Sequence, residues 1–289
     1  ARAGREVLLA AGAIGSPQLL MLSGIGPAEH LLEVGLPVRH DLPGVGENLQ
    51  DHPFLTLIWE VRDTRTLYGA DKPKPMAEWL LRRSGPLTST VAEALAFVRT
   101  RPGLPAADIQ FHAGAVFFEK HGEEEFDGHA FTIAPTLLAP RSRGLVWLRS
   151  SSPDAKPRIL VNALAEPEDM ESMLAGIELA REIAAQEPLA STVIRELKPG
   201  ADARGRDGLE DALRERLELV YHPVGTCRIG AADDGAAVVD PQLRVRGLEG
   251  LRVIDASVMP LIPGGNTNAP TIMIAERAAD LIRGRVPVA

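Results

Sequence analysis

The fold class is most evident in residues 6–24, which read Glu6-Val-Leu-Leu-Ala-Ala-Gly-Ala-Ile-Gly-Ser-Pro-Gln-Leu-Leu-Met-Leu-Ser-Gly24. The unbroken apolar run 7–11, which ends at a glycine, is typical of a strand buried on both faces of a parallel sheet. Ser16 and Pro17 then have the order of a helix cap and first helical residue, and Ser23-Gly24 ends the helix. Strand, glycine turn and helix in this order predict an α/β fold.

The C-terminal part of the chain has the same pattern. Residues 251–254 predict a second buried strand, which is followed by the turn Asp255-Ala-Ser257. The loop Pro263-Gly-Gly-Asn-Thr-Asn-Ala-Pro-Thr271 leads into a long helix predicted to end near residue 283, with Asn268 as its N-cap. Two α/β segments are therefore expected to flank the middle of the chain.

The middle of the chain has the pattern of a mostly antiparallel sheet with helices. The three- and four-residue spacing of apolar residues predicts an amphipathic helix at 167–185, and another is expected at 209–219, after a Pro/Gly-rich linker at 199–208. The predicted domains are 1–53, 54–204 and 205–289, the first and last forming one α/β domain. The predicted strands of the insertion are 54–61, 92–99, 108–117, 130–138 and 145–149.

Composition excludes several classes of protein. The 289 residues are 45% hydrophobic and carry a net charge of −8 without a dense basic cluster, so no nucleic-acid partner is expected. Cys227 is the single cysteine, which excludes an internal disulfide and a cysteine-based zinc site, and no metal is predicted. The longest apolar runs are far shorter than the ~20 residues that a membrane-spanning helix requires.

Four stretches are rich in the residues that proteins use where backbone approaches a ligand. A structural explanation is available for each: a capped helix, a self-bonded polar loop, an ordinary histidine and a helix start. Loops of this composition also commonly line sites, and a Gly/Asn loop before a helix presents free N–H groups to a ligand. The four are residues 12–26, Pro43-Gly-Val-Gly-Glu-Asn-Leu-Gln-Asp-His52, Tyr221-His-Pro-Val-Gly-Thr-Cys227 and the C-terminal unit made of residues 251–255 and 263–271.

Together, these four ordered motifs resemble the glucose-methanol-choline (GMC) oxidoreductase family, and its choline dehydrogenase-like branch in particular. The resemblance implies a partial FAD-binding, Rossmann-like domain with an inserted substrate domain built on an antiparallel sheet. It also implies FAD-dependent oxidation of a primary alcohol to an aldehyde, with hydride passing to flavin N5. The electron acceptor, a quinone-type molecule or oxygen, is left open, as is the choice between dehydrogenase and oxidase.

The resemblance also implies roles for individual residues. His222 is expected to take the hydroxyl proton, since an imidazole titrates near the required pH, and Asn268 is expected to orient the substrate oxygen. The residues expected to contact FAD are Ser16, Asn48, Asp255, Ala256, Asn266 and Thr267.

One family feature is missing from the sequence. Neither Gly24-Ile-Gly26 nor Gly44-Val-Gly46 continues as the Gly-x-Gly-x-x-Gly turn that holds the FAD pyrophosphate. We therefore interpret the chain as the C-terminal half of a longer protein, inactive by itself. A non-catalytic remnant or partner-binding fragment of the same fold, and a flavin-containing lyase, are the alternatives.

The sequence also bears on the substrate and on the cellular location. An aromatic cage for choline is not evident, because Trp59, Tyr68, Trp79 and Phe97 form no cluster in the sequence. We therefore expect an unspecified small primary alcohol. The resemblance implies a cytoplasmic or membrane-peripheral protein of a bacterium.

Overall fold

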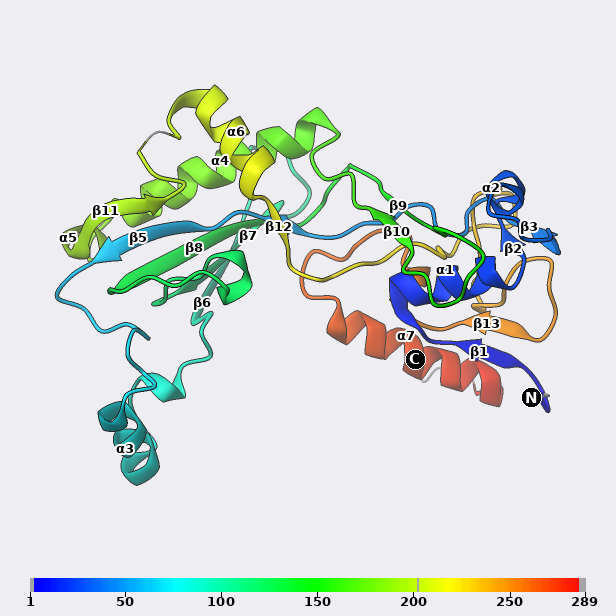
Figure 1. Ribbon diagram of the computed structural model, residues 1–289, viewed down its shortest axis with the longest axis horizontal. Coiled ribbons are helices and arrows are strands. Elements are labelled where there is room, and N and C mark those ends of the chain that lie inside the picture. The colour runs from blue at the N-terminus through cyan, green and yellow to red at the C-terminus, as the bar shows by residue number, and fades with distance from the viewer. Residues whose placement is uncertain (1–2, 202, 286–289) are drawn as a thin grey trace. The chain divides into compact units, whose positions relative to one another are not determined.

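The computed structural model describes residues 3–201 and 203–285, which form two compact units (Figure 1). Unit 1 consists of residues up to His52, Pro140–Glu166 and the chain from Tyr221 onward. Unit 2 consists of Pro53–Ala139 and Pro167–Val220.

Unit 2 is built on a seven-stranded sheet in which every pairing is antiparallel. The central strand β8 pairs with β7 on one side and with β5 and β4 on the other. Strand β6 continues the sheet beyond β7, β11 beyond β5, and β12 beyond β4. The strands are β4 (Pro53–Phe54), β5 (Leu57–Val61), β6 (Ala94–Val98), β7 (Ile109–Gly114), β8 (Ala130–Leu137), β11 (Val193–Lys198) and β12 (Glu218–Leu219).

Helix α4 (Pro167–Ala184) packs along one face of this sheet, as Figure 1 shows. The absence of a side chain at Gly176 permits the close approach, since a Cβ there would lie 3.2 Å from Pro135 and 3.3 Å from Ile109. The buried face of α4 includes Met173 and Ile177, as the helical periodicity predicted. The other helices of unit 2 are α3 (Pro73–Arg82), α5 (Leu189–Thr192) and α6 (Gly205–Arg216), with 3₁₀ turns η1 (Pro86–Thr88) and η2 (Lys120–Gly122).

Unit 1 contains short strands joined by long loops. Its elements are β1 (Val7–Leu9), α1 (Gly12–Leu22), β2 (Ile25–Gly26), α2 (Ala28–Glu33), β3 (His40–Asp41), β9 (Leu145–Trp147), β10 (Arg158–Leu160), β13 (Leu251–Val253), the 3₁₀ turn η3 (Ala256–Val258) and α7 (Asn268–Arg283). Three two-stranded sheets pair β1 with β13, β2 with β3, and β9 with β10.

The mixed α/β class is as predicted, but several local predictions are wrong. Strand β1 has β13 as its sheet neighbour and leaves Val7 47% and Leu8 43% exposed, whereas we expected burial on both faces. The predicted strand 145–149 is β9 of unit 1, paired with β10, and not part of the large sheet. Strand β11 was not anticipated.

Helix α1 begins four residues before the predicted cap, at Gly12, so that Pro17 lies inside the helix. Proline has no N–H, which leaves the carbonyl of Ala13, four residues earlier, without its helical donor. The hydroxyl of Thr226 donates to that carbonyl at 2.5 Å. The side chain of Thr226, which is distant in the sequence, therefore compensates for Pro17, a residue that helix-capping preferences place at the first position of a helix.

The boundaries of the compact units also differ from the predicted domains. Residues 140–166 group with unit 1, and the chain returns to unit 1 at Tyr221 and not at residue 205. Helix α7 begins at Asn268 with Thr267 at its N-cap, one residue before the predicted cap. Within the described ranges, no helix is both long enough and apolar enough to span a membrane.

Candidate active site

The loop at residues 43–52 lies between two other segments of unit 1 and pairs with both. On one side, Leu49 and Gly144 exchange two backbone hydrogen bonds, and Val146 N–H donates to Gly46. On the other side, Gln50 exchanges two such bonds with Val224, while Gly46 N–H donates to the carbonyl of Thr226. The loop therefore has the backbone partners of a central strand, which explains how so polar a segment is buried.

Side chains of the same loop hold the segment that leads to helix α7. The Asn48 amide donates to the carbonyls of Gly225 and Pro260, at 3.1 and 3.3 Å. The Gln50 amide donates to Pro260 at 3.1 Å, and its oxygen accepts from Ile262 N–H at 3.2 Å. Gly225 is required at this crossing, because its φ is +96° and a Cβ would lie 2.5 Å from the carbonyl oxygen of Asn48.

Two histidines meet at the end of this loop. The Nδ1 atoms of His52 and His222 are 3.0 Å apart, and their rings are nearly perpendicular. A single carboxylate oxygen of Asp51 accepts the backbone N–H of both residues, at 2.7 Å from His52 and 2.8 Å from His222. Asp51 therefore fixes the two main chains relative to each other.

Burial determines the electrostatics of this cluster. Desolvation raises the pKa of Asp51 from 3.8 to about 6. The hydrogen bonds from the two backbone N–H groups lower this pKa, but their effect is smaller than that of desolvation. Desolvation also lowers the pKa of His222 below 6.5, so its ring is neutral at pH 7 and can accept a proton.

Of the two candidate asparagines, Asn266 is the one that lies beside His222. Its Nδ2 is 3.3 Å from Nε2 of His222. Asn268 is the exposed first residue of α7, and the described part of the chain includes no contact between it and His222. The asparagine in contact with the histidine is therefore Asn266. It lies two residues before Asn268, which we expected to orient the substrate.

Most of the other residues expected to contact FAD form hydrogen bonds with groups of unit 1 or are buried in it. Asp255 accepts from Gly12 N–H at 3.0 Å, from the Ser16 hydroxyl at 2.5 Å and from Ser257 N–H at 2.8 Å, and so ties the start of α1 to η3. Ser16 is fully buried, the Ala256 carbonyl accepts from Gly225 N–H, and Thr267 is buried at the N-cap of α7. Asn266 is the exposed residue of this predicted set, and Asn268, which was expected to orient the substrate, is exposed as well.

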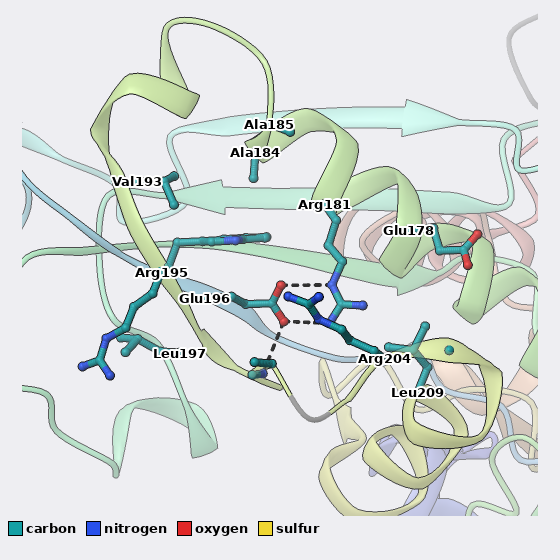
Figure 2. A pocket seen from close by; sticks show the side chains of 14 residues that line it. Glu178, Arg181, Ala184, Ala185, Val193, Arg195, Glu196, Leu197, Arg204 and Leu209 are labelled. Atoms are coloured by element: carbon teal, nitrogen blue, oxygen red, sulfur yellow. Dashed lines mark hydrogen bonds and ion pairs between the residues drawn. The ribbon is translucent and has the colours of Figure 1, made fainter.

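A cavity of about 800 Å³ lies in unit 2 and contains none of these residues (Figure 2). Figure 2 shows the ion pair that dominates its wall, in which Arg181 binds Glu196 through two nitrogens at 2.7 and 3.0 Å. Its arginine-rich lining also includes Arg195, which is bound to Glu60 at 2.7 Å, and Arg204. The ion pairs give this cavity a structural explanation.

Sequence reasoning had assigned no role to Asp51 or His52. Both lie in the motif at residues 43–52, and what marks them as functional is their contact with His222, which is 171 positions from Asp51 and 170 from His52. Cys227 is buried, which raises the pKa of its thiol, and the side chain serves as a small packing residue.

Comparison with known proteins identifies the family. Two models described as GMC oxidoreductase match the chain, one over residues 1–54 and the other over residues 140–275. The chain therefore belongs to the GMC oxidoreductase family.

Two of its relatives are dehydrogenases. The chain is 44% identical over 292 residues to an oxygen-dependent choline dehydrogenase of Chromohalobacter salexigens, with 100% of the chain and 52% of the relative aligned. It is 44% identical over 290 residues to an alcohol dehydrogenase [acceptor] of Pseudomonas putida, covering 98% of the chain and 52% of that protein. The chain spans about half the length of these curated relatives.

Solved structures agree with this placement. A formate oxidase of Aspergillus oryzae, studied for its FAD modification, superposes with a TM-score of 0.88 at 29% identity, over 98% of this chain and 54% of that one. The pyridoxine 4-oxidase of Mesorbium loti superposes with a TM-score of 0.83 at 29% identity, over 98% of this chain and 52% of that one.

Proposed function

We propose that this chain, as part of a longer protein, carries the proton-accepting part of an FAD-dependent oxidation of a primary alcohol to an aldehyde. The observation that carries the proposal is the pair formed by His222 and Asn266. Nε2 of a neutral, half-buried imidazole lies 3.3 Å from a carboxamide on an exposed loop, so one substrate oxygen can contact both groups. The alcohol and choline dehydrogenases among the relatives support this class of reaction.

Each of the two side chains has a chemical task in this proposal. His222 accepts the hydroxyl proton at Nε2. The negative charge that this leaves on the substrate oxygen makes the hydrogen on the neighbouring carbon easier to lose as hydride. Asn266, in place of Asn268, donates to the substrate oxygen and orients the carbinol hydrogen. FAD, when bound, supplies the acceptor for the hydride.

The described residues fit one end of such a cofactor. Helix α7 has no side-chain cap at Thr267, so the N–H groups of its first turn and the positive end of its dipole are free for an electron-rich group. Added Cβ atoms at Gly264 and Gly265 would meet nothing within 4 Å, which leaves open space beside this end. Asn266 and the backbone of residues 267–269 would hold the flavin there, whereas Ser16 and Asp255 act by fixing α1 and η3.

The test is made on a chimera that joins this chain to the part of the Chromohalobacter salexigens relative that it does not match. We expect His222→Ala to lower alcohol-dependent flavin bleaching by ~10²–10⁴, the usual contribution of general base catalysis, while flavin absorbance shows that FAD stays bound. Unchanged bleaching in His222→Ala would remove the histidine from this role. A chimera that binds FAD and is never bleached by a primary alcohol would instead favour the remnant or, if it forms product, the lyase.

Asn266 and Asn268 provide a matched pair in the same chimera. We expect Asn266→Ala to lower the rate of bleaching by about 10-fold or more, because the substrate oxygen loses its orienting donor. Asn268→Ala is expected to have a smaller effect. The reverse order would restore the role that the sequence had suggested for Asn268.

The substrate class proposed is a small primary alcohol. Trp59 stacks on Phe131, the Trp79 ring is covered by Arg83, and Tyr68 packs edge-on against His129. These aromatic rings are thus used in separate contacts of unit 2, and they offer no argument for a quaternary ammonium group.

A further inference from the structure

The contact between His52 and His222 requires a defined proton arrangement. At 3.0 Å, two Nδ1 atoms form one hydrogen bond, in which one nitrogen carries the proton and the other accepts it. The two nitrogens of a neutral imidazole are a donor and an acceptor, so the assignment of one ring determines that of the other.

The carbonyl of Pro263 decides which ring donates. Nε2 of His52 lies 3.1 Å from that oxygen, and a carbonyl oxygen can only accept a hydrogen bond. Nε2 of His52 must therefore carry a proton. A neutral imidazole carries one ring proton, so with that proton on Nε2 the Nδ1 of His52 accepts a hydrogen bond from Nδ1 of His222.

The same assignment determines the state of the other nitrogen of His222. A neutral His222 with its proton on Nδ1 has a free lone pair on Nε2, which is the atom that faces Asn266. The carboxamide N–H of Asn266 is a suitable donor to that lone pair, and the proton on Nε2 of His52 is independent of this contact.

We propose that His52 is a positioning residue that holds His222 in its Nδ1–H tautomer and thereby keeps Nε2 available as the base. The hydrogen bonds run from Nδ1 of His222 to Nδ1 of His52, and from Nε2 of His52 to the carbonyl of Pro263. Asp51 maintains the geometry by accepting both backbone N–H groups, so the rings enter the contact from fixed main chains. The catalytic consequence rests on the function proposed for His222, but the tautomer does not.

The tautomer can be measured on this chain without cofactor or substrate. In a chain with ¹⁵N-labelled histidine, two-bond N–H correlations distinguish protonated from unprotonated ring nitrogens, and loss of signals in His222→Gln assigns residue 222. We expect a protonated Nδ1 and an unprotonated Nε2 at His222 at pH 8. His222 found as the Nε2–H form in the wild-type chain would overturn the proposal.

Two substitutions of His52 separate positioning from packing. His52→Leu removes the acceptor, and we expect the proton of His222 to move to Nε2, the form that an unrestrained imidazole prefers. His52→Asn keeps an acceptor oxygen bonded to Cγ, where Nδ1 was, and should retain the Nδ1–H form. Equal spectra for His222 in the leucine variant and the wild type would contradict the proposal.

His30 is an internal control in every spectrum. Its Nε2 accepts the backbone N–H of Leu148 at 3.1 Å, so it should also be an Nδ1–H histidine, whatever residue is present at position 52. A changed His30 signal in His52→Leu means that unit 1 has unfolded, and the wild-type and His52→Asn spectra then decide.

The chimera adds a kinetic measurement that separates the two proposals. We expect His52→Leu to lower turnover by about 10²-fold, as the loss of the correct tautomer would require, and His52→Asn to restore most of it. The expected tautomer together with full activity in His222→Ala would refute only the proposed function. An Nε2–H form together with an inactive His222→Ala would refute only the positioning role.

Discussion

The two units satisfy their buried backbone in different ways. In unit 2, strand β8 is paired along both edges, and its eight residues are all buried. In unit 1, the loop at residues 43–52 is also buried over most of its length, but its partners are carbonyls and N–H groups of two distant loops, with side chains such as Gln50 and Asp51 at the crossings.

This difference shows where chemistry can be placed in the molecule. A regular ladder leaves no backbone group free, whereas irregular crossings depend on individual polar side chains whose position and protonation are thereby fixed. His52 and His222 lie at such a crossing. In unit 2, the buried carboxylate of Glu119 is held instead by an ion pair with Arg216 at 2.7 Å.

The largest effect is expected from breaking that ion pair in unit 2. Arg216→Met leaves the carboxylate of Glu119, which is 3% exposed and also bound by Thr56, without its counter-charge. We expect a loss of about 3–5 kcal/mol in the free energy of unfolding, measured with urea. Arg206→Met is the control, because its ion pair with Glu171 is exposed and should contribute far less to stability than the buried pair. Equal losses in the two variants would mean that burial of the pair is unimportant.

The next effect concerns Asp51 and depends on pH. Its folded-state pKa of about 6 is above the unfolded value, so the group stabilises the fold fully below about pH 4, and that contribution is lost as the pH rises through 6. In Asp51→Asn, an amide oxygen can accept the same two N–H bonds without a buried charge. We expect the stability of Asp51→Asn relative to wild type to increase by roughly 2–3 kcal/mol between pH 4 and pH 7 in urea titrations. A pH-independent difference would contradict the raised pKa.

A smaller effect is expected from the hydroxyl that compensates for Pro17 in α1. Thr226→Val keeps the shape of the side chain but leaves the buried carbonyl of Ala13 without its donor, at a cost of about 2 kcal/mol. Thr88→Val is the matched control, since its hydroxyl donates to Gly85 at an exposed position and should cost under about 0.5 kcal/mol. If both variants unfold at the same urea concentration, the hydrogen bond from Thr226 to Ala13 does not stabilise unit 1.

The smallest effect is expected on the exposed surface of unit 1. Met273 of α7 is 58% exposed, so Met273→Ala should change the free energy of unfolding by less than ~0.5 kcal/mol. Met173→Ala on α4 of unit 2, where the side chain is fully buried, should cost about 2–5 kcal/mol in the same assay. A cost above about 1 kcal/mol at Met273 would show that α7 is covered in solution.

Periodicity predicted the central elements of unit 2, although it missed strand β11 and helix α3. Helix α4 and strands β6, β7 and β8 lie within the predicted segments, because a helix or strand that packs on one face repeats its apolar residues at a fixed spacing. The same reasoning failed at β1, where an apolar run predicted burial, since burial depends on what covers the strand and not on the strand itself.

The sequence by itself determined the family, the mixed α/β class and the motifs in which the site residues lie, because residue types and their order suffice for these. Only the tertiary structure decided that Asn266 and not Asn268 lies beside His222, and that Asp51 and His52 join them. Loops have no repeating geometry, so the direction of a loop side chain depends on contacts with residues far away in the sequence. The proton on His222 is set in the same way, by a carbonyl 41 residues further along the chain.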